Sequence, residues 1–100
     1  MSRRFLFWGN SLEPVSDAFW ADMERPYSRE LAWVAHNQGA TAIRRAAPAS
    51  FYGGCWLYPY ALEVVFDNDA AKLGFDNAFP IKSVLEPKLF EESSDWPIVS

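Results

Sequence analysis

The sequence predicts an α+β fold in which a small, mainly antiparallel sheet of three to five strands carries two helices packed on one face. Apolar residues alternate with a period of two over residues 56–66, which is typical of a strand. Two segments between residues 11 and 39 carry apolar residues at helical spacing instead. The expected strands and helices do not alternate regularly, which argues against a doubly wound parallel sheet.

The size of the chain predicts one compact domain over residues 1–100. Half of the residues are hydrophobic and 22% are charged, which is ordinary for a globular protein. Aromatic residues make up 17%, including five Trp, so this short chain can bury enough surface to form a core. From about residue 87 the sequence is acidic, and we expect this tail either to pack back on the domain or to extend from it.

The first half of the chain predicts one strand followed by two helices. The apolar run Arg3–Trp8 is expected to be a strand in the middle of the sheet. A first helix is expected to start at Ser11–Pro14, because Ser caps helices and Pro is tolerated in the first turn, and to end or kink at Pro26. The second helix is expected to start with Ser28 as its cap and to stop at Gly39.

Two apolar stripes on these helices are expected to face the sheet. Their members are Val15, Ala18, Phe19 and Met23 on the first helix and Leu31, Val34 and Ala35 on the second. Trp20 and Trp33 fall outside the stripes. They either complete the core, which we prefer, or line a partner surface.

The second half of the chain predicts most of the sheet. The segment at 40–47 fits a helix or a strand, and we favour the strand. Gly53-Gly54 predicts a turn before residues 56–66, which form one long strand or two strands broken near Pro59. Residues 67–69 can cap a short helix that closes at Gly74. Residues 79–85 are expected to form a last strand.

The charge is unevenly placed and bears on the kind of partner. Residues 1–50 carry a net charge of +1 and residues 51–100 a net charge of −5, which together give −4. Acidity disfavours direct binding to nucleic acids and to anionic membranes, and favours proteins with a basic or nucleic-acid-binding surface. The apolar run Phe5–Trp8 is too short for a signal peptide. We therefore expect a cytoplasmic protein that does not contact membranes.

A small cysteine-dependent enzyme is one alternative function. Cys55 is the only cysteine of the chain and His36 the only histidine, so they would serve as nucleophile and base. Such a pair must approach within hydrogen-bonding distance. We prefer the interpretation that Cys55 is a small buried apolar residue and that His36 is solvated near a helix end.

Other site chemistries have little support in the sequence. One His and one Cys cannot supply the four ligands of a structural zinc site. Residues 67–69 resemble the opening of a calcium-binding loop, but Lys72 stands where that loop needs Gly and Ala78 where it needs Glu. No glycine-rich phosphate loop occurs. We therefore expect no catalytic residues, no metal and no cofactor.

The favoured function is that of a non-catalytic, acidic binding protein that inhibits or neutralises a partner protein by occupying its surface. This class includes phage-encoded inhibitors of bacterial defence, nucleic-acid mimics and toxin-immunity proteins. Trp and Tyr are enriched in interface hot spots, and the chain has nine of them. The expected partner-binding residues are aromatic anchors and steering acids: Phe51, Tyr52, Trp96, Glu86, Glu91, Glu92 and Asp95. A structural subunit that forms a homo-oligomer through its aromatic residues is the second alternative.

Overall fold

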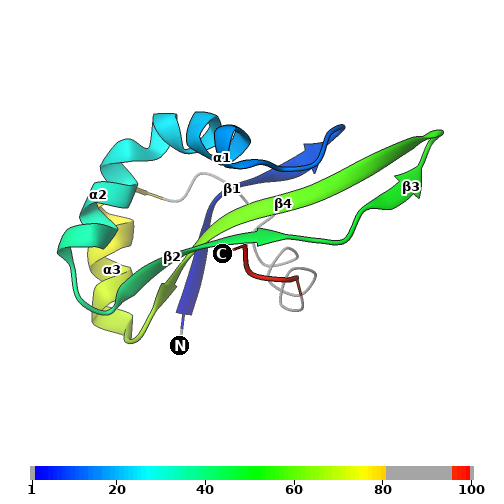
Figure 1. Cartoon of the computed structure of the whole chain (residues 1–100). Helices are drawn as coiled ribbons and strands as arrows, with labels where there is room; N and C mark the ends of the chain where they lie inside the picture. The colour runs from blue at the N-terminus through cyan, green and yellow to red at the C-terminus, as the bar shows by residue number, and fades with distance from the viewer. Residues whose placement is uncertain (1, 81–95, 100) are drawn as a thin grey trace.

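The computed structural model describes residues 2–80 and 96–99 of the chain. Its strands are β1 (Ser2–Ser11), β2 (Ala40–Ala46), β3 (Ser50–Tyr52) and β4 (Cys55–Phe66). Its helices are α1 (Asp17–Glu24), α2 (Ser28–His36) and α3 (Asp69–Ala78), and the 3₁₀ turn η1 (Arg25–Tyr27) joins α1 to α2. Figure 1 shows these helices beside an antiparallel sheet, which confirms the predicted α+β class.

Among the described residues β4 is the central strand and β1 lies at an edge, so the expectation that Arg3–Trp8 lies in the middle of the sheet is wrong. β4 pairs antiparallel with β1 along one edge and, in succession, with β2 and β3 along the other. β2 lies beside residues 60–66 and β3 beside residues 55–57, so β2 and β3 resemble one strand interrupted at residues 47–49. Residues 97–99 extend the sheet beyond β2. There, Ala46 N–H donates to Pro97 O (3.1 Å) and Val99 N–H donates to Arg44 O (2.8 Å).

Pro59 lies inside β4 without breaking it. The interruption falls instead in the neighbouring β2–β3 line, where Ala47 N–H donates to Pro59 O at 2.9 Å. The N and the C=O of a strand residue face the same edge, so the missing N–H of Pro59 also faces residues 47–49. No regular ladder runs there, and β4 therefore stays continuous. Of the two sequence alternatives, the single long strand is confirmed.

One face of the sheet packs against the helices and forms the core. On β4 this face carries Tyr60, Leu62, Val64 and Phe66, as the period-two pattern predicts. The buried clusters around these residues also contain Phe7, Trp20, Val34 and Phe75. Since these come from β1, α1, α2 and α3, all three helices contribute to the same core.

The two Trp residues left outside the predicted stripes both pack against the core. Trp20 is only 1% exposed and meets the rings of Phe7 and Tyr60 at centroid distances of 6.1 and 6.2 Å. Trp33 packs edge-on against Phe75 at 5.3 Å. Ala35, which the stripe pattern places toward the sheet, is exposed instead. The α2 stripe is therefore rotated toward the side of the helix that faces α3.

The predicted start of the first helix and the predicted cap of the second are wrong. β1 continues to Ser11, whose hydroxyl accepts a hydrogen bond from Glu13 N–H (3.1 Å), and α1 begins only at residue 17. Ser16 is its cap, because the Ser16 hydroxyl accepts from Phe19 N–H at 3.2 Å. α2 does begin at Ser28, but Ser28 is its first helical residue, with φ −59° and ψ −33°, and Tyr27 takes the cap position without a side-chain hydrogen bond.

A bulge in β1 allows the run Arg3–Trp8 to bury apolar side chains on both faces. Phe5 pairs with Glu63 and Phe7 with Leu62, so Leu6 is the extra residue between them. Two residues spaced by two normally face the same side of a sheet. The bulge instead places Phe7 in the helix-facing core and Phe5 on the opposite face, and both rings are buried.

α3 is longer than predicted. Asn68 caps it by accepting a hydrogen bond from Ala71 N–H (2.8 Å), which confirms that residues 67–69 form a helix cap. The helix does not stop at Gly74. A Cβ at Gly74 would stand 3.5 Å from the indole of Trp33, so the glycine lies where α3 passes closely over α2. Residues 79 and 80 form no strand, and the remainder of that predicted strand lies outside the described residues.

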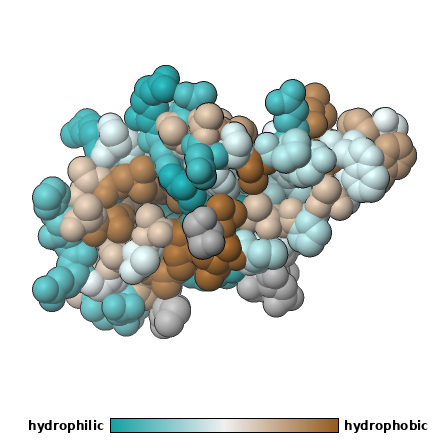
Figure 2. Space-filling model, viewed as in Figure 1, coloured by the Kyte–Doolittle hydropathy of each residue, from teal (hydrophilic) through white to brown (hydrophobic). Residues whose placement is uncertain are grey.

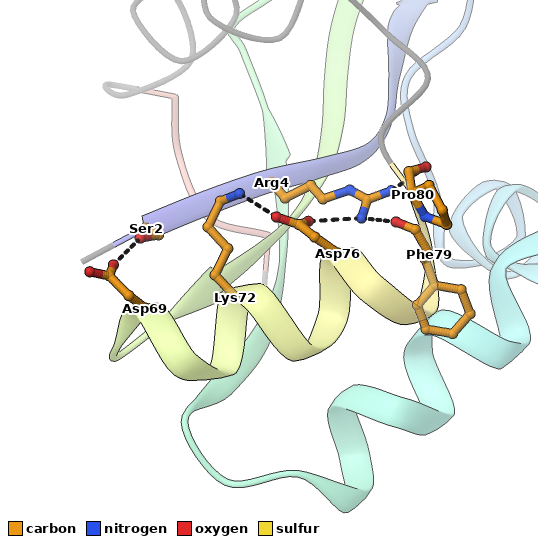
Figure 3. Close-up of polar contacts among 7 residues, drawn as sticks. All are labelled: Ser2, Arg4, Asp69, Lys72, Asp76, Phe79 and Pro80. Carbon is orange, nitrogen blue, oxygen red and sulfur yellow. Dashed lines mark hydrogen bonds and ion pairs between the residues drawn. The ribbon is translucent and has the colours of Figure 1, made fainter.

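Arg4 ties the C-terminal end of α3 to β1 (Figure 3). Its Nη1 donates to Asp76 Oδ1 at 3.0 Å and also to the carbonyl oxygen of Phe79, and its Nη2 donates to Pro80 O at 3.3 Å. Lys72 Nζ donates to the second oxygen of Asp76 at 2.7 Å. Arg4 is buried, and hydrogen bonds to these acceptors compensate the burial of its charge.

None of the helices described here is both long and apolar enough to cross a membrane.

Candidate functional site

The β3–β4 hairpin projects from the body of the molecule (Figures 1 and 2) and carries a group of exposed aromatic side chains. Phe51 is 62% exposed, Tyr52 75% and Trp56 55%. Phe51 and Trp56 lie directly opposite each other on the two strands, and their rings meet edge-on at 5.4 Å. We call Phe51, Tyr52 and Trp56 the aromatic tip.

The hairpin turn is formed by two glycines. Tyr52 pairs with Cys55, so Gly53 and Gly54 are the only residues between the strands. Their φ angles are +62° and +85°, and positive φ at both central residues defines the type I′ turn that matches the twist of a hairpin. A Cβ at either position would meet no atom within 4 Å. Backbone conformation, rather than lack of space, therefore requires glycine in this predicted turn.

The aromatic tip is exposed because β4 extends beyond the ends of β1 and β2 and beyond the helices. β1 ends at Ser11 opposite Tyr58, and β2 ends at Ala46 opposite Tyr60. Trp56 shares its face of β4 with Tyr60 and the other helix-facing residues. The helices cover that face at Tyr60 and leave Trp56 largely exposed. Trp56 and Phe51, which lies opposite it, thus continue the core face without cover, whereas Tyr52 pairs with Cys55 and lies on the other face.

The surroundings of the tip are uncharged at its end and acidic at its base. Residues 46–62 include no Asp, Glu, Lys or Arg. At the base of the hairpin, Ser11 pairs with Tyr58, and the exposed Glu13 follows two residues later. Asp17, at the start of α1, is also exposed. A partner that covers the tip would therefore meet an apolar end and an acidic base.

Cys55 and His36 are not brought together. Cys55 begins β4 in the hairpin, whereas His36 ends α2 four residues before the first residue of β2, which pairs with Phe66 at the far end of β4. At about 3.3 Å per residue, the length of β4 places roughly 30 Å between them. Cys55 is exposed, and its thiol donates to Tyr52 O at 3.4 Å. The expectation that Cys55 is buried is wrong, because the hairpin extends beyond the core.

An ion-pair network on the face of the sheet opposite the helices was not anticipated from the sequence. Glu63 is 0% exposed, and its carboxylate accepts hydrogen bonds from Arg3 Nε (2.6 Å) and Arg45 Nε (2.5 Å). Arg45 Nη1 also donates to Trp96 O at 2.8 Å. We call Arg3, Glu63 and Arg45 the charged triad. A signal was present, because Glu63 is the only charged residue between positions 46 and 66 and a buried charge needs partners.

A second ion pair joins β2 to α1 on the helix-facing side. Arg44 donates from Nε and Nη2 to the two carboxylate oxygens of Glu24, at 3.0 and 2.5 Å. The hydrogen bond to Glu24 raises the pKa of Arg44 above its ordinary value. Partial burial lowers this pKa, but the negative charges of Glu24 and Asp17 raise it further, so the net shift is upward. The guanidinium also lies 5.6 Å from the centroid of Trp20. Arg44 is therefore a structural cation that stays charged at any pH the fold survives.

The structure places only some of the predicted partner-binding residues. Phe51 and Tyr52 are exposed in the hairpin, and Trp56, which the sequence assigned only to the strand, lies beside them. The two-residue turn was the signal for Trp56, because it fixes residue 56 opposite residue 51. Trp96 is half-buried, and its carbonyl accepts from Arg45, so it lies with the charged triad and not with the tip. The four predicted acids, Glu86, Glu91, Glu92 and Asp95, lie outside the described residues.

Comparisons with other proteins add no assignment. The chain matches no protein-family model, no curated protein and no solved structure. Within residues 2–80 and 96–99, no three His, Cys, Asp or Glu side chains gather in a way that could hold a metal ion. The aromatic tip is therefore the best-defined candidate site on geometric grounds.

Proposed function

We propose that the protein is a non-catalytic binding protein that inserts the aromatic tip into a surface of a partner protein. The observation that carries the proposal is the exposure of Phe51, Tyr52 and Trp56 on a hairpin that extends beyond the helices. Soluble proteins rarely leave grouped apolar side chains in water without a use for them. Large aromatic side chains are also the residues that most often dominate interface energetics.

The hairpin is built to present these side chains at low entropic cost. The type I′ turn and the pairing of β3 with β4 fix the backbone, and the contact between Phe51 and Trp56 restricts both rings. A binding element that is already ordered loses less conformational entropy when a partner covers it. The tip therefore needs little rearrangement to bind.

The partner is expected to be basic beside an apolar pocket. Glu13 and Asp17 are exposed near the base of the hairpin, and the chain carries a net charge of −4. Complementary charges steer association and are screened by salt, whereas the aromatic contacts are not. Inhibition or neutralisation of that partner would follow from occupation of its surface, and the chain would act as a cytoplasmic inhibitor of this kind.

Affinity capture from a native lysate of the source cells tests the proposal. The immobilised wild type is compared with a variant carrying Phe51→Ser, Tyr52→Ser and Trp56→Ser, and with a control carrying Leu73→Ser. Leu73 is a similarly exposed apolar residue in α3, so the control tests loss of surface hydrophobicity alone. A captured protein that is retained by the control and lost from the tip variant supports the proposal.

Two results would contradict this function. Equal capture by the wild type and the tip variant would exclude the hairpin as the binding element. Capture that disappears after nuclease treatment would assign the interaction to nucleic acid instead of a protein. Rising salt should weaken capture by slowing association. Capture that does not change with salt would show that Glu13 and Asp17 do not steer the partner.

A further inference from the structure

In the part of the chain that the structure describes, the outer edge of β3 has an unpaired backbone beside the aromatic tip. Within the described residues, β3 pairs only with β4. A two-residue hairpin closes with a hydrogen-bonded pair, here Tyr52 and Cys55, so the next pair, Phe51 and Trp56, is of the non-hydrogen-bonded kind. The N–H and the C=O of Phe51 therefore point away from β4. They form a ready site for another strand.

Apart from its short length, this edge lacks the features that normally protect an exposed strand. Native edges are commonly blunted by short strands, by charged side chains, by Pro within the strand or by cover from another element. β3 contains only Ser50, Phe51 and Tyr52, and no charged residue occurs between positions 46 and 62. Among residues 2–80 and 96–99, only its short length guards this edge against pairing.

We infer that, in the absence of another partner, a second copy of this chain covers the hairpin by antiparallel pairing of β3 with β3 across a two-fold axis at Phe51. The outward N–H and C=O of Phe51 in each copy then bond to those of Phe51 in the other. This arrangement is self-complementary, as an isologous interface requires. The inference concerns the surface of the proposed function and rests on it, because a different partner would compete for the same hairpin.

The geometry brings the aromatic side chains of both copies together. Phe51 lies opposite Trp56 on one face of the hairpin. Pairing at the axis sets the two Phe51 rings side by side on that same face. A row of four aromatic rings results, in the order Trp56, Phe51, Phe51 and Trp56, and it removes part of the exposed surface of Phe51 and Trp56 from water.

Charge favours a second copy at this place over other places on the surface. The protein carries a net charge of −4, so two copies repel each other over most approaches. The β3 edge brings no charged residue of segment 46–62 near its counterpart. The opposite edge of the hairpin is less suitable, because it adjoins Ser11 and the exposed Glu13. Self-association is therefore directed to β3.

The area involved predicts a weak dimer. The exposed parts of Phe51 and Trp56, which form the row, amount to about 250 Å² per copy, given full areas of about 150–250 Å² each. The pair would bury at most about 500 Å² from these side chains, below the roughly 1,200 Å² of a standard stable interface. The dimer should therefore dissociate on dilution and give way to a partner that fits the tip better.

Sedimentation equilibrium over about 1 µM to 1 mM tests the inference. The wild type should pass from monomer to dimer as its concentration rises. Phe51→Pro should stay monomeric, because Pro removes the outward N–H and the ring, while the inward ladder uses no N–H from residue 51. Phe51→Ala keeps the outward N–H and loses the ring, so its dimer dissociation constant should rise by about tenfold. Leu73→Ser should behave as the wild type.

Amide chemical shifts on dilution locate the interface. Shifts at residues 50–53 that change with concentration, beside unchanged shifts in α3, are expected for pairing through β3. Near-ultraviolet circular dichroism confirms that each variant is folded, and Trp56→Ser provides a second variant that leaves the β3 edge intact and still weakens the dimer. A wild type that is monomeric throughout, or a folded Phe51→Pro variant that dimerises as the wild type does, would overturn the inference. A monomer whose partner capture still depends on the aromatic tip would leave the proposed function standing.

Discussion

Replacement of Glu63 by Gln isolates the contribution of the charged triad to stability. The buried carboxylate accepts one short hydrogen bond from each of two arginines, and Gln offers one oxygen and directs an NH₂ group at the other arginine. Breaking a buried ion pair by removing one partner costs about 3–5 kcal/mol, because the remaining charges stay buried without compensation. Because Arg3 and Arg45 keep 22% and 15% of their side chains exposed, water compensates their charges in part, and we expect Glu63→Gln to lower the free energy of unfolding by about 3 kcal/mol, the low end of that range.

Urea denaturation followed by Trp fluorescence measures this loss. With a slope of about 1–3 kcal/mol per molar urea, the midpoint should fall by about 2 M. Asp22→Asn is the matched control, since it makes the same carboxylate-to-amide change in the exposed pair of Asp22 with Arg25, where less than about 1 kcal/mol is expected.

A variant that replaces the whole triad with apolar residues separates lost charge compensation from lost packing. Arg3→Met, Glu63→Leu and Arg45→Met together leave no unpaired charge at this place, so most of the stability lost in Glu63→Gln should return. If Glu63→Gln is no less stable than Asp22→Asn, the reasoning from burial and pairing is refuted. If the triple variant is as unstable as Glu63→Gln, unpaired charge is not the cause of the loss.

Three further substitutions probe other parts of the fold. Gly9→Ala should cost about 1–3 kcal/mol in urea denaturation, because its Cβ would stand 2.7 Å from Tyr60 Oη, and the cost should shrink in a Tyr60→Phe background; an equal cost in both backgrounds contradicts the clash. Asn68→Ala should lower calorimetric stability by about 1 kcal/mol through loss of the α3 cap, while Asn68→Ser should retain most of it; equal losses would exclude capping as the reason. Gly54→Ala should strain the turn at φ +85° by about 1–2 kcal/mol and speed hydrogen exchange at Cys55 but not in α3, so unchanged exchange at Cys55 would show that the turn tolerates a Cβ.

The sequence predicted the sheet better than the helix boundaries. Period-two alternation identified β4, and the Gly53-Gly54 pair identified its turn, because both signals are local. The start of α1 and the cap of α2 were missed for a different reason. Both Ser11 and Ser16 precede α1, and only tertiary structure decides which of them caps, because β1 continues to Ser11. Ser28 is already in helical geometry after η1, so it begins α2 without capping it.

The core position of Trp20 could not be read from the helix pattern. The stripe was drawn through Phe19 and Met23 on the assumption of a helix that starts near residue 11. The actual α1 has eight residues and lies across Phe7 and Tyr60, so Trp20 points into the sheet and Phe19 lies at the rim. Helical spacing identifies the apolar face of a helix. Which residues on or beside that face are buried depends on the strands and helices packed against it.

The candidate site was predicted in part. Phe51 and Tyr52 were recognised as exposed aromatic residues next to the long strand, whereas Trp56 was assigned to its buried face. Alternation tells which face a residue occupies but not how far along the strand the helices reach. The charged triad was missed because its three members come from β1, β2 and β4, and the pairing of those strands is a long-range property.

Because β4 is continuous past Pro59, the register of this one strand is fixed at two places, in the body of the sheet and in the hairpin. On the body side, the charged triad holds Glu63 opposite the helix-facing surface; on the hairpin side, the glycine turn sets Cys55 against Tyr52. A slip of one residue would reverse the side on which every β4 residue points, so it would drive Glu63 into the apolar core. Inserting a single residue between Leu57 and Tyr60 therefore forces a choice. The fold must give up either the core or the present orientation of the aromatic tip, because one uninterrupted strand serves both.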